Sequence, residues 1–149
     1  MLEKIEIKGY KSIKDITLDL KPINILIGAN GVGKSNFITF FSLVNNIYEQ
    51  NLQNYTMACG ADSLLYYGLK HTNFIEGSLD FGNNTYSFKL APAKDGSLYI
   101  SEEKNLYKYN NITYPSQNLR ESKIKDSSLT RDSFLRNRSE ERRVGKECV

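Results

Sequence analysis

The spacing of apolar residues predicts that the chain opens with two half-buried strands. Apolar and polar residues alternate over 5–8 and again over 16–20. Such alternation places one face of a strand on a core and the other in solvent. Lys21–Pro22 then interrupts the second strand. The run Ile23–Ile27 is almost continuously apolar and predicts a third strand that is buried.

The next segment has the period of a helix. Phe37, Phe40, Phe41 and Val44 recur at helical spacing, which predicts a helix from about Lys34 to Glu49. The polar, tyrosine-rich stretch 51–67 has a single apolar patch at its end. For this stretch we expect a loop and one short helix.

The period returns to two after residue 73. Segments 75–81 and 86–90 alternate around a Gly-Asn-Asn turn, which predicts an antiparallel hairpin. Leu98 and Ile100 predict a further strand, and residues 106–109 could add a fourth. Residues 115–137 are rich in Ser, Lys and Arg with widely spaced apolar residues, so we expect a helical or disordered segment there.

The most specific motif lies between the predicted buried strand and the predicted helix. Residues 28–35 fit the pattern G-x-x-x-x-G-K-[ST]. Its glycines let successive backbone N–H groups converge on phosphate oxygens at a helix N-terminus. Lys34 is then expected to reach the β- and γ-phosphates and the Ser35 hydroxyl to ligate Mg²⁺. The predicted nucleotide-binding residues of the loop are Gly28, Ala29, Asn30, Gly31, Val32, Gly33, Lys34, Ser35 and Asn36.

The C-terminal residues resemble something other than a protein domain. Residues 138–148 are similar to the translation of a common DNA-sequencing adapter, so we expect the natural sequence to stop at about Asn137 and exclude 138–149 from the fold. The competing interpretation is a charged C-terminal helix.

Composition sets only broad limits on function. The 149 residues are 40% hydrophobic and 25% charged, which is ordinary for one globular domain. The net charge of +3 falls to +2 without the tail, which is too small to indicate nucleic-acid binding by itself. No signal peptide or membrane-spanning run is visible, so a cytoplasmic protein without membrane contact is expected.

The phosphate loop resembles that of one group of ATPases. Gly28–Asn36 has the form G-x-N-G-x-G-K-S-N, which is typical of ABC-type heads of the RecF, SMC and OLD-like proteins, often called AAA family ATPases. Residues 5–15 resemble their opening strand and its basic corner, with Gly9–Tyr10 in place of the usual Asn-Phe. The resemblance implies an α/β fold. The expected architecture is the N-terminal lobe of a P-loop NTPase, with a mixed sheet around one P-loop helix and an antiparallel β-meander.

The resemblance also implies ligands, partners and boundaries. ATP and Mg²⁺ would bind at the loop, and Lys11 at the corner is a candidate nucleotide contact. The resemblance implies a longer parent protein linked to DNA metabolism or defence, in which heads of this group form ATP-dependent dimers. DNA is one candidate partner, and RNA and protein are the alternatives. The lobe would occupy residues 1–114 of an incomplete domain, followed by the segment 115–137 and the tail 138–149.

Hydrolysis needs groups that the sequence does not provide. An acidic residue after an apolar strand, a second carboxylate and a Ser-Gly-Gly-type loop are not found, so the chain as given is predicted not to hydrolyse ATP. Glu102 and Glu103 are the nearest look-alikes.

Two other functions compete with that of a DNA-associated ATPase. One is a nucleotide-dependent regulator or transporter-type ABC subunit that acts on a protein partner, in which Tyr10 could imitate an adenine-stacking aromatic. The other is a small GTPase, which would need an Asn-Lys-x-Asp motif that is absent from the sequence.

Overall fold

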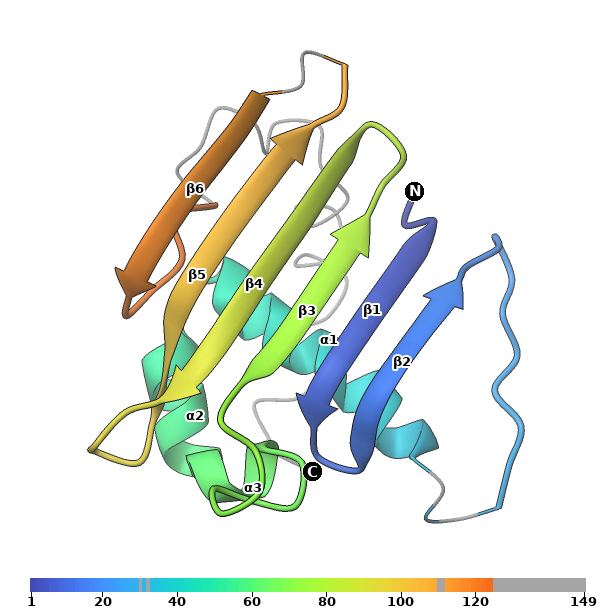
Figure 1. The fold of residues 1–149 in the computed structure, drawn as a ribbon. Helices are drawn as coiled ribbons and strands as arrows, with labels where there is room; N and C mark the ends of the chain where they lie inside the picture. Colours follow the sequence, from blue (N-terminus) through green and yellow to red (C-terminus); the bar gives the residue numbers. More distant parts are fainter. Residues whose placement is uncertain (30, 32, 110–111, 125–149) are drawn as a thin grey trace.

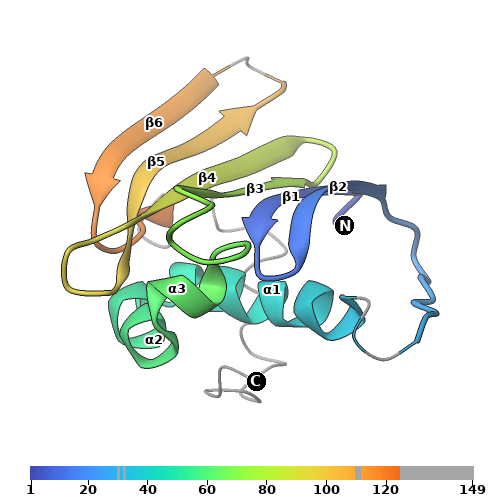
Figure 2. The ribbon, with the colours of Figure 1, turned by 60° about the horizontal axis from the view of Figure 1, so that its bottom comes forward.

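The computed structural model contains one antiparallel sheet with helices on one face (Figures 1 and 2). It describes residues 1–29, 31, 33–109 and 112–124. The strands in spatial order are β2 (Ile13–Asp19), β1 (Lys4–Tyr10), β3 (Ile75–Asp80), β4 (Asn84–Pro92), β5 (Leu98–Tyr107) and β6 (Ile112–Leu119). The helices are α1 (Lys34–Tyr48), α2 (Leu52–Cys59) and α3 (Ala61–Leu64). The predicted opening strands, long helix and central hairpin are therefore confirmed.

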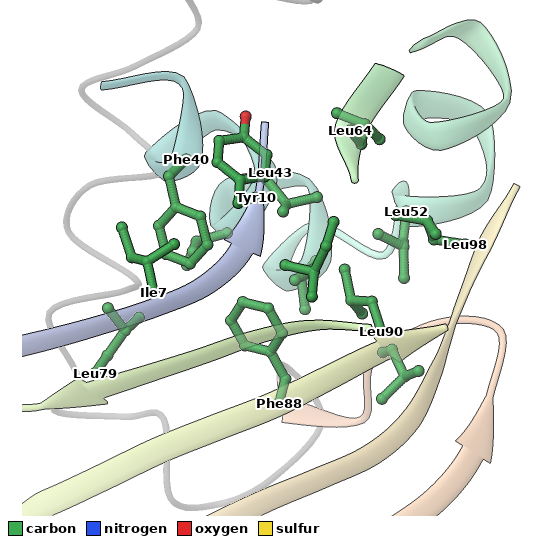
Figure 3. Close-up of a cluster of buried hydrophobic side chains, with 14 of the residues drawn as sticks. Ile7, Tyr10, Phe40, Leu43, Leu52, Leu64, Leu79, Phe88, Leu90 and Leu98 are labelled. Carbon is green, nitrogen blue, oxygen red and sulfur yellow. The ribbon is translucent and has the colours of Figure 1, made fainter. Parts of the chain in front are cut away.

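The core lies between α1 and the sheet (Figure 3). Phe40 of α1 is fully buried and packs edge-on to Tyr10 of β1, with ring centroids 5.3 Å apart. It also stacks on Phe88 of β4 at 6.0 Å. Gly77 of β3 makes room for both phenylalanine rings, because an added Cβ would lie 2.4 Å from Phe88 and 2.9 Å from Phe40. Close packing of this kind fixes the helix over the centre of the sheet.

The opposite face of the sheet is charged. Lys8, Glu76, Lys89 and Glu102 are cross-strand neighbours on β1, β3, β4 and β5. Their signs alternate, and Lys89 Nζ lies 3.3 Å from a Glu76 carboxylate oxygen. Opposite charges on facing residues stabilise a sheet, and this face needs no covering layer.

The expected mixed sheet is wrong for the described residues, because every pair of named strands is antiparallel. The buried strand predicted at Ile23–Ile27 is also wrong, because this run has no regular structure and Ile23, Ile25 and Ile27 are 79–89% exposed. A local turn directs the chain away from the β2 edge. Asn24 stabilises it by accepting from the Lys21 N–H at 3.0 Å and donating to the Lys21 carbonyl at 2.6 Å.

The C-terminal part of the sheet also differs from expectation. Residues 106–107 end the long strand β5 and do not start another, and residues 115–119 belong to β6 instead of a helical or disordered segment. The part of 115–137 beyond residue 124, and the tail 138–149, lie outside the described residues.

Residues 120–124 pack back onto the domain through two carboxylates. Glu121 accepts hydrogen bonds from the N–H groups of Leu52 and Gln53, at 2.9 and 3.0 Å, and so caps α2. Glu103 of β5 is buried and accepts from the Tyr86 hydroxyl at 2.7 Å, from the Ser122 hydroxyl and from the Lys123 N–H at 3.1 Å. Burial, and then the neighbouring Glu103, raise the pKa of Tyr86, which keeps the hydroxyl a donor.

Candidate nucleotide-binding site

The motif 28–35 connects the irregular segment after β2 to the start of α1. Gly31 and Gly33 have φ values of +86° and +99°, a backbone region that residues with side chains rarely occupy. Gly33 is the N-cap of α1, and the first helical bond runs from the Phe37 N–H to the Gly33 carbonyl at 2.9 Å. No side chain among the described residues caps this end. The first turn therefore presents backbone N–H groups and the positive end of the helix dipole.

Lys34 folds back over the loop. Its ammonium group donates a hydrogen bond to the carbonyl of Gly28, at the other end of the motif. The side chain thus spans the motif and holds a positive charge beside the N-terminus of α1. Ser35 follows in the first turn and is exposed, so its hydroxyl is open to a ligand. Ala29 is also exposed, while Asn30 and Val32 lie outside the described residues.

The corner between β1 and β2 supports the start of α1. The Asn36 amide donates to the Ser12 hydroxyl at 2.7 Å. An added Cβ on Gly33 would lie 3.2 Å from the same hydroxyl, so a larger residue there would have to displace the Ser12 side chain by a few tenths of an ångström, and the φ of Gly33 favours glycine as well. The sequence pattern does not by itself indicate a role for Ser12. The signal that could have found it is its place next to Lys11 in the corner motif.

Lys11 lies at this corner with a φ of +48°, and its N–H donates to the Leu64 carbonyl at 2.9 Å. Partial burial lowers the pKa of its ammonium group. Lys11, Ser12 and Asn36 line a surface depression of about 620 Å³, whose other wall comes from 62–68. The structure therefore brings the candidate contact Lys11 to the same surface region as the end of the phosphate loop.

Tyr10 does not have the exposure of a base-stacking aromatic. Its side chain is fully buried, and its hydroxyl shares a 3.0 Å hydrogen bond with Thr39. The interpretation of Tyr10 as an adenine-stacking aromatic, as in a transporter-type subunit, is therefore wrong.

The acidic look-alikes are placed away from the loop. Glu102 faces outward on the charged side of the sheet. The Glu103 carboxylate accepts hydrogen bonds from Tyr86 and from residues 122 and 123. Within the described residues there is no group of three or more His, Cys, Asp or Glu side chains able to hold a metal ion. Ser35 is the side chain of the loop that fits Mg²⁺, because a hydroxyl is an oxygen ligand of the kind Mg²⁺ accepts together with phosphate oxygens. No helix in the described part of the chain has the length and apolarity needed to span a membrane.

Comparison with known proteins identifies the family of the chain. The chain belongs to the AAA ATPase domain family, whose model matches residues 1–141. It is 32% identical over 98 residues to the chromosome partition protein Smc of Methanocaldococcus jannaschii. That match covers 65% of this chain and 8% of the Smc protein, so the chain corresponds to a small part of that relative's length.

A solved structure is also similar, at 20% identity and a TM-score of 0.44, over 92% of this chain and 95% of that one. It comes from work described as "Structural biochemistry of ATP-driven dimerization and DNA stimulated activation of SMC ATPases".

Proposed function

We propose that residues 28–36 bind the triphosphate of ATP together with Mg²⁺. The observation that carries this proposal is the position of the motif. In a chain of an ATPase family, the two motif glycines with positive φ lead into the N-terminus of α1, whose N-cap residue Gly33 has no side chain, and Lys34 lies folded over the loop. In this arrangement backbone N–H groups would bind the phosphate oxygens and Lys34 would exchange its Gly28 contact for the β- and γ-phosphates. Ser35 would ligate Mg²⁺, which neutralises charge between the phosphates.

For the wider role of this lobe, we infer a nucleotide-binding lobe of a longer, DNA-associated ATPase whose heads dimerise in an ATP-dependent way. The G-x-N-G-x-G-K-S-N form of the loop and the similarity to an Smc protein support this inference. A transporter-type subunit is less well supported, because the aromatic that would have stacked adenine, Tyr10, is buried.

The test is a titration of the chain with Mg-ATP, extended to millimolar concentration. A charge-assisted contact contributes about 1.5–3 kcal/mol, so Lys34→Ala should weaken ATP roughly 10- to 150-fold. The matched control is Lys94→Ala, which removes an exposed lysine from the β4–β5 connection. The proposal fails if Lys34→Ala and Lys94→Ala bind ATP as tightly as the unmodified chain.

A further inference from the structure

We propose that Tyr67 stacks on the nucleoside base of the bound triphosphate, and that the depression beside the phosphate loop is the nucleoside pocket. This inference rests on the proposed function, because it places the second half of the ligand that the loop would hold.

The depression lies next to the end of the loop. Asn36 belongs to the motif and also lines the depression, together with Lys11 and Ser12 of the β1–β2 corner. The far wall is formed by 62–68, including Asp62 and Tyr67. At about 620 Å³ the depression is within the usual size range of small-molecule sites. A nucleotide with its phosphates on the first turn of α1 can therefore direct its base along this depression.

The wall that carries Tyr67 is held to the sheet. The Tyr66 N–H donates to the Gly9 carbonyl, and the Lys11 N–H donates to the Leu64 carbonyl, both at 2.9 Å. Tyr10 and Leu65 form an isolated antiparallel bridge between the same segments. An aromatic side chain whose backbone is already held in place binds a base more tightly, because less conformational freedom is lost when the ligand binds.

The Tyr67 side chain is presented to solvent. It remains 74% exposed although Tyr66 and His71 contact its ring edge-to-face, with centroids 4.5 and 6.4 Å away. These neighbours orient the ring without covering it. Every nucleobase has a π-face that an exposed aromatic ring can stack on, so this geometry is suited to a base.

Charges around the depression favour one direction of binding. Lys34 lies at the start of α1, and Asp62 lies on the wall of 62–68. Asp62 also accepts a 2.9 Å hydrogen bond from the Leu69 N–H, which fixes its carboxylate there. Phosphates are attracted to Lys34 and repelled by the Asp62 carboxylate, so the uncharged base belongs at the Tyr67 end.

The experiment compares two ligands on the full chain: Mg-ATP, and Mg-tripolyphosphate, which has no base or ribose. Tyr67→Ala should weaken ATP about 5- to 20-fold, the lower part of the range for loss of one base–aromatic stack. It should leave tripolyphosphate within about twofold, since the loop is untouched. Tyr67→Phe keeps the ring and should bind both ligands normally. Tyr109→Ala removes another exposed tyrosine, 94% accessible and outside the depression, and is the matched control.

Each outcome separates the two proposals. If Lys34→Ala weakens the binding of both ligands while Tyr67→Ala binds ATP normally, the proposal of base stacking on Tyr67 is wrong and the proposal for the phosphate loop is retained. Equally weakened binding of ATP and tripolyphosphate by Tyr67→Ala also overturns base stacking, since the effect would then come from a change in the structure of the loop. If the unmodified chain binds neither ligand at millimolar concentration, both proposals fail.

Discussion

Replacing Glu103 by alanine tests whether this residue is structural, as its contacts indicate, or a catalytic carboxylate. The change leaves the buried hydroxyls of Tyr86 and Ser122 without their acceptor and frees the Lys123 N–H. Hydrogen bonds to a charged group contribute about 1.5–3 kcal/mol each, and part of this loss is recovered by water. We therefore expect the free energy of unfolding to fall by about 3–5 kcal/mol. For a chain of this length the thermal midpoint should drop by about 10–15 °C.

The assay is thermal unfolding followed by circular dichroism, with Glu102→Ala as the matched control. Glu102 is the adjacent, exposed acid on the outer face, so its removal should change stability by no more than about 0.5 kcal/mol. Glu103→Gln retains an acceptor of similar shape and should fall between the two. A midpoint for Glu103→Ala within 2 °C of the control, a window well inside the drop expected from the lost contacts, would refute the structural role.

Three further results are expected. Glu121→Ala removes the cap of α2 and should cost about 1–2 kcal/mol in urea unfolding; a change below about 0.5 kcal/mol would show that the cap contributes little. Although burial opposes ionisation of Asp80, hydrogen bonds from Lys108 and a backbone N–H lower its pKa, so its stabilising contribution is complete above about pH 4 and is lost on further acidification. Asp80→Asn should therefore lose less thermal stability than the unmodified chain between pH 5 and pH 2, an assay range around the ordinary Asp pKa, and equal losses would contradict this. Finally, phosphate release from ATP should be no faster with the unmodified chain than with Lys34→Ala, because the acidic look-alikes Glu102 and Glu103 lie on the outer face of the sheet and in the contact with residues 122–123, away from the loop; steady Lys34-dependent release would overturn this.

The strands and helix that follow a clean apolar period could be predicted from the sequence, because each has one face on the core. The full length of strand β5 could not be predicted from the sequence. Its register shifts by one residue opposite Lys89–Leu90, and the next inward position is Glu103 instead of an apolar residue. A bulge followed by a buried acid interrupts the period that marks a strand.

The run Ile23–Ile27 shows the limit of apolarity as evidence. Its composition indicates burial but does not identify what covers it, and no described strand pairs with it. For the site, the motif located the loop and Lys34. The Asn36–Ser12 contact joins residues 24 positions apart and needed the fold, as did the depression with Tyr67.

The exposed run Ile23–Ile27 has a practical consequence for any measurement on this chain. It carries no charge and no proline and has high β propensity, and its residues 23–26 line an open cavity of about 700 Å³ with Leu18, Phe37 and Phe41. Uncharged β-prone segments that are left uncovered can recruit identical copies into intermolecular sheets. We therefore expect the isolated chain to self-associate as its concentration rises, and apparent cooperativity in nucleotide titrations must be separated from assembly by repeating them at several protein concentrations.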